Sequence, residues 1–354
     1  MNEQGLIKVL IVDDSALIRS LLSEIVKQSD DMVLVGAAPD AYRARDLVNQ
    51  YQPDVITLDV EMPKVDGLTF LEKLMKARPT PVIMISSLTE AGADVTLRAL
   101  ELGAVDFIAK PKLDVVQGIE GYRAAIIEKI RSAARANVKR LSKTAVSAQD
   151  RIGSRFKTTE KILAIGASTG GTEAIKQLLQ QLPVDSPGIV MTQHMPPGFT
   201  RTFAARLDAC CAMKVVEAQG GERIMPGTAY LAPGHLHLTV KRSGADYQIA
   251  LDDRPRVSGH KPSVDVMFSS VAEAVGENAV AVLLTGMGKD GALGMQQIAH
   301  QQGYTIAQNE ESCVIFGMPR EAIKTGTVRE ILPLDAMGER ILAVFAAMGT
   351  AYRI

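Results

Sequence analysis

Short apolar runs alternate with helical segments along nearly the whole chain, and this alternation constrains the fold more than any other feature. In the first part of the sequence the apolar runs lie at 9–12, 33–37, 55–58, 82–85 and 107–109. Apolar strands separated by amphipathic helices are typical of a parallel sheet with helices on both faces. The sequence therefore predicts an N-terminal (βα)5 domain with a parallel sheet, completed by a last helix over 115–139.

The alternation is interrupted once and then starts again. Residues 141–159 are polar, rich in Ser, Thr, Lys and Arg, and without apolar periodicity, which predicts a linker. Further apolar runs lie at 162–165, 189–191, 280–284 and 304–307, and 227–251 alternates with period two. We expect a C-terminal doubly wound α/β domain with an added antiparallel hairpin. The predicted divisions are 1–125 for the first domain, 126–158 for the helix end and linker, and 159–354 for the second domain.

The charge and the apolar runs exclude several classes of protein. The formal net charge is -1 and there is no long basic tract, which argues against a nucleic-acid-binding protein. The first apolar run, 6–12, stops at two aspartates and is too short and too acidic for a signal peptide. Every other apolar run is also shorter than a bilayer-spanning helix requires. We therefore expect a cytoplasmic protein with no nucleic-acid partner and no membrane insertion.

Polar side chains stand at the ends of the predicted strands in the first domain. Asp13 and Asp14 follow the first run, Asp59 the third, Ser86 the fourth and Lys110 the fifth. The carboxyl ends of parallel strands share one edge, where ligands bind. Any one of these residues alone could be a solvated residue at the end of a strand. Five of them, each at the end of a predicted strand, favour a ligand-binding site. Three carboxylates suit Mg²⁺, and a lysine beside them suits phosphoryl transfer to an aspartate.

A serine between glycines follows the first apolar run of the second domain. Residues 166–171 read GASTGG, and a helical pattern follows them. A strand, a tight turn and a helix can present the hydroxyl of Ser168 as a nucleophile, with helix N–H groups nearby for an oxyanion. A phosphate or dinucleotide loop is the alternative. The glycine spacing is not G-x-G-x-x-G, however, and no Walker lysine follows.

A base and an acid are available for this serine. His194 directly follows the run at 189–191, and Asp290 lies in the glycine-rich loop after 280–284. Three strand-end loops would thus bring Ser168, His194 and Asp290 to one sheet edge, as a nucleophile, base and orienting carboxylate require. In α/β-hydrolases the acid precedes the histidine in the chain, so the order here predicts a separate solution of the same geometry.

The other four histidines offer weaker candidates. His235 and His237 are two residues apart in an alternating segment and would share a strand face, as in half of a metal site. No cysteine or histidine cluster nearby completes such a site, so we favour a structural role for both. His260 and His300 have no supporting context in the sequence.

Residues 7–112 resemble a response-regulator receiver domain. The resemblance rests on DDS at 13–15, Asp59 followed by Met62-Pro63 and Asp66-Gly67, SS at 86–87, and KP at 110–111. It implies that Asp59 accepts phosphate from a histidine kinase. It also implies Mg²⁺ held by Asp13, Asp14, Asp59 and the backbone carbonyl of Glu61, with Ser86 sensing the phosphoryl group and Lys110 pairing with it. Phe107 stands where such domains have an aromatic switch, and it lacks a hydroxyl.

Residues 160–350 resemble the catalytic domain of the chemotaxis protein-glutamate methylesterases, the CheB family. The motifs are GASTGGT at 166–172, QHM at 193–195, PGH at 233–235 and TGMGKDG at 285–291. The resemblance implies Ser168 as nucleophile, His194 as base and Asp290 as orienting acid, with oxyanion donors near Thr169 and Met287. It implies no cofactor for ester hydrolysis. The implied substrates are glutamate methyl esters on the cytoplasmic helices of chemoreceptors, and many members also deamidate receptor glutamines.

Two sites on one chain suggest regulation of the second by the first. We expect the receiver to restrict access to the catalytic edge, and phosphorylation of Asp59, which adds about -1.5 to -2 charges, to shift Ser86 and residues 88–93. A DNA-binding response regulator is one alternative, but residues 160–354 show βα units and no basic recognition helix. A non-catalytic scaffold is another, and only an activity measurement distinguishes it.

Overall fold

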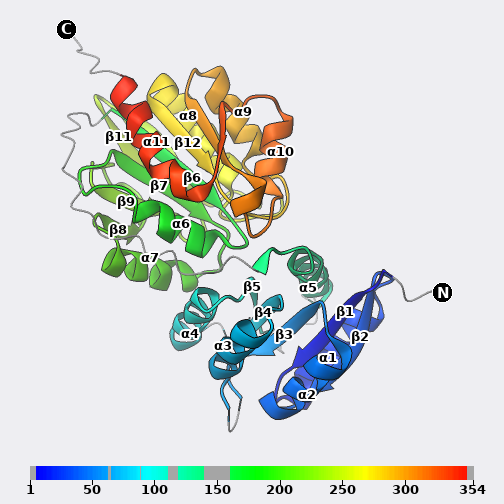
Figure 1. Cartoon of the computed structure of the whole chain (residues 1–354). Coiled ribbons are helices and arrows are strands. Elements are labelled where there is room, and N and C mark those ends of the chain that lie inside the picture. The colour runs from blue at the N-terminus through cyan, green and yellow to red at the C-terminus, as the bar shows by residue number, and fades with distance from the viewer. Residues whose placement is uncertain (1–4, 63–64, 88, 111–118, 139–159, 349–354) are drawn as a thin grey trace. The chain divides into compact units, whose positions relative to one another are not determined.

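The computed structural model describes residues 5–62, 65–87, 89–110, 119–138 and 160–348. The chain divides into two compact units, Met1–Ser142 and Lys143–Ile354, and each is described here by itself (Figure 1). The predicted linker at 141–159 lies outside the described residues, as do Pro63 and Pro111 of the receiver motifs. The domain limits at 125 and 159 therefore stay predictions.

The N-terminal unit is a five-stranded parallel sheet in the order β2-β1-β3-β4-β5. Its strands are β1 (Ile7–Val12), β2 (Met32–Ala38), β3 (Val55–Asp59), β4 (Val82–Ser86) and β5 (Asp106–Ala109). Its helices are α1 (Ala16–Lys27), α2 (Ala41–Tyr51), α3 (Gly67–Ala77), α4 (Glu90–Glu101) and α5 (Ile119–Ala133). The predicted (βα)5 fold is confirmed, and its last helix ends at Ala133, before the predicted end at 139.

Side-chain caps fix the points where the helices of this unit leave the sheet edge. Ser15, Asp40, Asp66 and Thr89 each accept a hydrogen bond from the backbone N–H three residues later. Such caps satisfy N–H groups that a helix start otherwise leaves without a partner. Strands β3 and β4 are buried at every position, as expected for a sheet covered on both faces. The polar residues at the ends of β1, β3 and β4 are therefore held at the carboxyl edge of this sheet.

The C-terminal unit is built on a seven-stranded parallel sheet in the order β14-β13-β12-β6-β7-β9-β8. These strands are β6 (Ile162–Ala167), β7 (Gly188–Gln193), β8 (Lys214–Glu217), β9 (Thr228–Leu231), β12 (Ala279–Leu283), β13 (Tyr304–Gln308) and β14 (Glu330–Leu332). The helices are α6 (Gly171–Leu179), α7 (Phe199–Cys210), α8 (Val264–Val275), α9 (Ala292–His300), α10 (Met318–Lys324) and α11 (Leu334–Ala347). The doubly wound fold is confirmed.

A separate two-stranded hairpin joins this sheet through helix α8. Strands β10 (His237–Ser243) and β11 (Asp246–Asp252) pair antiparallel, as the period-two pattern predicted. The start of the same stretch was predicted wrongly, because β9 pairs parallel with both β7 and β8. The four residues of β9, three of them buried, are too few to show a period that separates a parallel strand from an antiparallel one. The short edge strands β8 and β14 were not predicted at all.

The topology places three strand ends side by side at the centre of the larger sheet. Strand β6 lies between β7 and β12, and the chain winds outward from β6 toward β7 and β9 before it returns to β12. Ile162 and Ala164 of β6 belong to a core cluster shared with Val264 and Phe268 of α8. Ligand sites in such sheets lie at the carboxyl ends of the strands where the winding direction reverses. The edge formed by β12, β6 and β7 is therefore where a ligand site is expected.

Within the part of the chain that the structure describes, no helix has both the length and the apolar character needed to cross a membrane.

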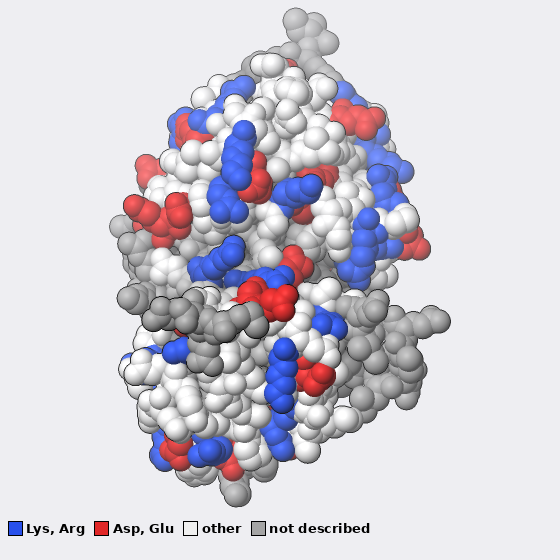
Figure 2. All heavy atoms as spheres, turned by 90° about the vertical axis from the view of Figure 1, so that its right-hand side faces the viewer, with Lys and Arg blue, Asp and Glu red and all other residues white. Residues whose placement is uncertain are grey.

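Figure 2 shows one face of the molecule, on which Lys and Arg side chains lie interspersed with Asp and Glu.

Candidate active site

Ser168, His194 and Asp290 form one hydrogen-bonded chain at this sheet edge. The Nδ1 atom of His194 lies 3.1 Å from Oγ of Ser168, and its Nε2 lies 2.7 Å from Oδ2 of Asp290. A carboxylate only accepts, so in the neutral form of the ring the proton belongs on Nε2, and Nδ1 is left to accept the serine proton. The three residues follow β6, β7 and β12, as the sequence predicted.

Asp290 is buried at the N-terminus of α8, which supplies most of its hydrogen bonds. It accepts from Oγ of Ser263 at 2.8 Å and from the backbone N–H groups of Val264 at 2.7 Å and Asp265 at 3.1 Å. Burial by itself would raise the pKa of Asp290. The hydrogen bonds from His194, Ser263 and the Val264 N–H outweigh burial and lower this pKa to about 2. Asp290 is therefore a carboxylate at neutral pH.

Ser263 was missed by the sequence analysis. It is the N-cap of α8, and its hydroxyl accepts from the N–H of Val266 while it donates to Asp290. The available signal was a serine directly before a helical apolar pattern, followed by an aspartate in the first turn. Nothing in that pattern indicates that the helix start faces a carboxylate from another loop.

The turn that carries the nucleophile is fixed by its neighbours. The N–H of Ser168 donates to the carbonyl of Thr285 at 3.0 Å, and Nε2 of Gln193 donates to the carbonyl of Ser168 at 2.9 Å. Gly170 has φ +77°, a conformation that glycine adopts without strain. A Cβ on Gly286 would lie 2.8 Å from Cβ of Ser168, so this close approach of the two loops requires glycine.

The two predicted oxyanion residues both lie beside the nucleophile. Thr169 follows Ser168 at the start of the α6 turn, and its carbonyl accepts from the hydroxyl of Thr285 at 3.0 Å. Met287 follows Gly286, the residue packed against Ser168. Their positions are compatible with backbone N–H groups close to the reacting carbonyl, and the role itself stays a prediction.

A second carboxylate, Asp265, is buried directly behind Asp290. Its Oδ1 accepts from the N–H of Gly294 at 2.9 Å, and its Oδ2 accepts from the hydroxyl of Ser258 at 3.3 Å. Burial, followed by the negative charge of Asp290, raises the pKa of Asp265 to about 6, although the Gly294 N–H opposes the shift. A carboxyl whose pKa is raised on folding destabilises the fold as pH rises from its unfolded to its folded pKa.

Asp265→Asn should therefore gain stability relative to the parent as the pH rises. The amide keeps an acceptor for Gly294 and removes the charge, so the difference in unfolding free energy should move in favour of the variant by on the order of 1–3 kcal/mol between pH 4 and pH 8. Thermal melts of both proteins across this range measure the difference. Glu273→Gln, an exposed change on the same helix, is the control. A difference for Asp265→Asn that does not vary with pH would contradict the assignment.

The acidic pocket of the N-terminal unit forms as predicted. Carboxylate oxygens of Asp13, Asp14 and Asp59 lie within 4.8 Å of one another, and Nζ of Lys110 is 2.8 Å from Oδ2 of Asp59. Oδ2 of Asp13 is buried without a hydrogen-bond partner among the described residues. Burial and the charge of Asp59 raise the pKa of Asp13 to about 6, and burial also raises the pKa of Asp59 against the effect of Lys110. Such uncompensated negative charge fits a divalent cation.

Ser86 and Phe107 occupy the expected strands next to this pocket. The hydroxyl of Ser86 donates to the carbonyl of Gly92 at 3.2 Å and accepts from Oγ1 of Thr96 at 2.6 Å, so it is bonded to α4. Phe107 is buried, and Nζ of Lys129 lies 5.6 Å from its ring centroid. The hydrogen bond from Thr96 to Ser86 was not expected from the sequence, because it depends on where α4 begins.

The remaining histidines differ from expectation in two ways. His235 is exposed and precedes β10, whereas His237 is buried within it, so the two do not share a strand face. His260, for which the sequence offered no context, is stacked on His194. Their ring centroids are 3.7 Å apart and the planes differ by 8°. His300 is exposed at the end of α9.

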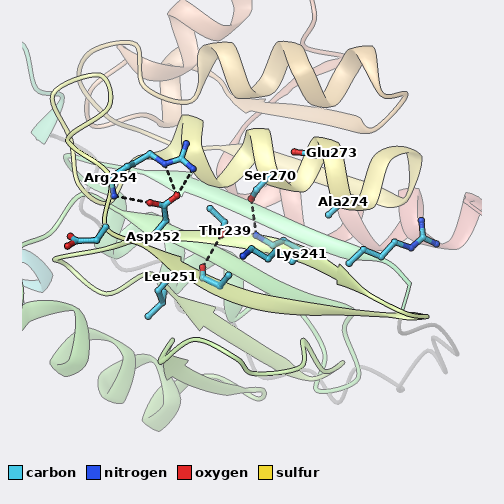
Figure 3. A pocket seen from close by; sticks show the side chains of 12 residues that line it. Thr239, Lys241, Leu251, Asp252, Arg254, Ser270, Glu273 and Ala274 are labelled. Atoms are coloured by element: carbon cyan, nitrogen blue, oxygen red, sulfur yellow. Dashed lines mark hydrogen bonds and ion pairs between the residues drawn. The ribbon is translucent and has the colours of Figure 1, made fainter.

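A hollow lies elsewhere in the C-terminal unit, between α8 and the hairpin. Its volume is about 670 Å³, and the residues that line it include Lys241, Asp252, Arg254 and Glu273 (Figure 3). Asp252 and Arg254 pair with each other across its rim. None of Ser168, His194 and Asp290 lines it. This hollow is therefore separate from the reactive site, which is the sheet edge described above.

Comparison with known proteins identifies the family of each domain. The family model for the CheB methylesterase matches residues 163–341, and that for the response regulator receiver domain matches residues 9–118. The protein-glutamate methylesterase/protein-glutamine glutaminase of Thiobacillus denitrificans is 57% identical over 97% of this chain and 98% of its own. The chain belongs to the CheB methylesterase family. A second relative in this family, protein-glutamate methylesterase/protein-glutamine glutaminase 2 of Pseudomonas aeruginosa, is 56% identical over 98% of this chain and 99% of its own.

A solved CheB structure supports the same assignment. The CheB methylesterase catalytic domain of Thermotoga maritima superimposes with a TM-score of 0.52 at 38% identity, covering 53% of this chain and 100% of that domain. The predicted fold, a receiver followed by a CheB catalytic domain, is thereby confirmed. A DNA-binding response regulator, the first alternative, is excluded, because the region after the receiver is a CheB methylesterase domain.

Proposed function

We propose that this chain removes methyl groups from glutamate γ-methyl esters on the cytoplasmic helices of chemoreceptors, and that phosphorylation of Asp59 raises its rate. The observation that carries the proposal is the unbroken hydrogen-bonded chain from Ser168 through His194 to Asp290. The names of the relatives extend the proposal to glutamine side chains, whose amide is hydrolysed by the same steps. The reaction takes place in the cytoplasm, where these receptor helices lie.

Acylation begins when Oγ of Ser168 attacks the ester carbonyl carbon. Nδ1 of His194, 3.1 Å away, takes the serine proton as the new C–O bond forms. The imidazolium is stabilised by the carboxylate of Asp290 at 2.7 Å, which remains ionised. His194 then gives its proton to the departing methoxide, the C–OCH3 bond breaks, and methanol leaves the acyl-enzyme. With a glutamine substrate the leaving group is ammonia.

Deacylation repeats the same proton transfers with water as the nucleophile. Nδ1 of His194 takes a proton from the water that attacks the acyl carbon, and then returns a proton to Oγ of Ser168 as the ester bond to the enzyme breaks. The product is the receptor glutamate. Backbone N–H groups of Thr169 and Met287 are our candidates for the donors that bind the carbonyl oxygen while it carries negative charge.

The acidic pocket of the receiver domain regulates the esterase through phosphorylation of Asp59. Asp13, Asp14, Asp59 and the carbonyl of Glu61 would hold Mg²⁺, which neutralises charge on the phosphoryl oxygens when bound. One carboxylate oxygen of Asp59 attacks the phosphorus of a phosphohistidine on the kinase, and the histidine nitrogen leaves. Lys110 then pairs with a phosphoryl oxygen. Ser86, now bonded to Gly92 and Thr96, would turn toward the phosphoryl group and release that end of α4.

A phosphodonor should therefore raise esterase activity only when Asp59 is intact. The measurement is methanol release from methylated receptor fragments with and without a small phosphodonor and Mg²⁺, for the parent and for Asp59→Asn. We expect the parent to be stimulated and the variant to lose all of the stimulated part. Asp54→Asn, an exposed change in the same unit, is the control for charge removal. If the phosphodonor stimulated Asp59→Asn as much as the parent, phosphorylation of Asp59 would not be what regulates the esterase.

A further inference from the structure

The ring of His260 covers one face of the His194 imidazole. The centroids are 3.7 Å apart and the planes are nearly parallel, at 8°. The two hydrogen bonds of His194 lie at the edges of its ring and leave the faces to be packed by other groups. His260 therefore lies where the imidazole would move if it rotated out of line with Ser168. The side chain of His194 is only 8% exposed, although it must meet a substrate.

A tight turn delivers His260 to this position. The backbone groups of Val257 and His260 bond to each other in both directions, at 3.0 and 2.9 Å. The two residues between them, Ser258 and Gly259, have φ of +53° and +82°, as in a type I′ turn. A serine with positive φ is unfavourable unless its surroundings hold it. Here its hydroxyl donates to Asp265 at 3.3 Å.

Buried His237 is hydrogen-bonded to both ends of the segment 255–263, which contains the turn. Its Nδ1 accepts from the N–H of Ser263 at 3.1 Å, and its Nε2 donates to the carbonyl of Pro255 at 3.2 Å. Both bonds are satisfied only by the neutral ring, and burial lowers the pKa of His237 accordingly. The same segment ends in Ser263, which holds Asp290. The segment 255–263 thus contacts both the base, through His260, and the acid, through Ser263.

We propose that His260 is a positioning residue of the esterase, whose ring face holds His194 in line with Ser168 and stabilises its imidazolium. The inference rests on the function proposed above and concerns a residue to which that function assigns no role. During acylation His194 becomes cationic, and the face of a neutral aromatic ring attracts a cation. The property that matters is a flat aromatic face at residue 260. A ring without nitrogen should therefore serve, whereas an aliphatic side chain of similar bulk should not.

The test compares His260→Ala, His260→Leu and His260→Phe in the full chain, with methylated receptor fragments, Mg²⁺ and a phosphodonor. We expect kcat to fall roughly 10-fold in His260→Ala and His260→Leu, with KM changed by less than about 2-fold. His260→Phe should recover most of the lost rate. Thermal melts of each variant show whether the fold is intact, and the leucine variant controls for filling the space.

The outcomes separate this inference from the proposed function. If the parent releases no methanol, the proposed function fails before the variants are compared. If the parent is active and His260→Ala has the same kcat, the positioning role is wrong. A raised KM with unchanged kcat would instead make residue 260 a substrate contact. A phenylalanine variant no better than the leucine variant would also overturn the proposal, because the aromatic face would then be irrelevant.

Discussion

Replacing Ser168 with alanine should reduce methanol release from methylated receptor fragments by roughly 10⁴–10⁶-fold. The substitution removes one oxygen from a turn whose backbone is bonded to Thr285 and Gln193, so the fold should not change. What is lost is the atom that forms the acyl-enzyme, and His194 then has no serine proton to take. Any residual rate would come from water attacking in the same pocket.

Two controls make this result interpretable. Ser243→Ala changes an exposed serine at the end of β10 and should keep the parent rate. Phosphorylation of Asp59 in Ser168→Ala should equal that of the parent, which shows that the N-terminal unit is intact. A variant at Ser168 that retains more than about a tenth of the parent rate would rule out the serine as nucleophile.

Asp290→Asn should lower kcat by roughly 10³–10⁴-fold. Oδ2 of Asp290 accepts from both His194 and the N–H of Val264. An amide nitrogen in that place donates to Nε2 of His194 and moves the imidazole proton to Nδ1. That nitrogen then faces Ser168 with a proton and no longer accepts one. The variant should also be less stable, because the amide nitrogen meets the Val264 N–H.

The control for this change is Asp253→Asn, at an aspartate whose side chain is 84% exposed. It should leave kcat unchanged. The rate and the unfolding temperature of Asp290→Asn are measured together, so that loss of fold and loss of the base are distinguished. A fully folded Asp290→Asn with a kcat within about 10-fold of the parent would show that the tautomer of His194 does not depend on Asp290.

The principal residues of both sites could be predicted because of how parallel sheets are built. Each of Ser168, His194 and Asp290 lies in the loop that follows a buried strand, and the carboxyl ends of such strands meet at one edge. The same reasoning brought Asp13, Asp14, Asp59 and Lys110 together in the N-terminal unit. Parallel strands predict the shared edge, whereas the contact between the three side chains also depends on the order β12-β6-β7, which places their strands side by side.

The surroundings of these residues could not be predicted from periodicity. Ser263 and His260 come from the 255–263 segment, which has neither strand nor helix pattern, and their contacts depend on a turn with two positive φ angles. Thr285 and Gln193 fix the nucleophile through bonds to backbone groups of other loops. Such contacts link residues far apart in the sequence and leave no local signal. The parallel pairing of β9 was missed for a similar reason, since a strand of four residues does not reveal its neighbours.

The most direct test of the account is to trap the covalent intermediate. The phosphorylated protein is mixed with a methylated receptor fragment, quenched in acid within one turnover, and digested for mass spectrometry. The account predicts an adduct on Ser168 whose mass is the sum of the two partners less one methanol, and no adduct in Ser168→Ala. Methanol release at the parent rate by Ser168→Ala, with no adduct on Ser168 in the parent, would show that water attacks the ester directly and would contradict the central claim.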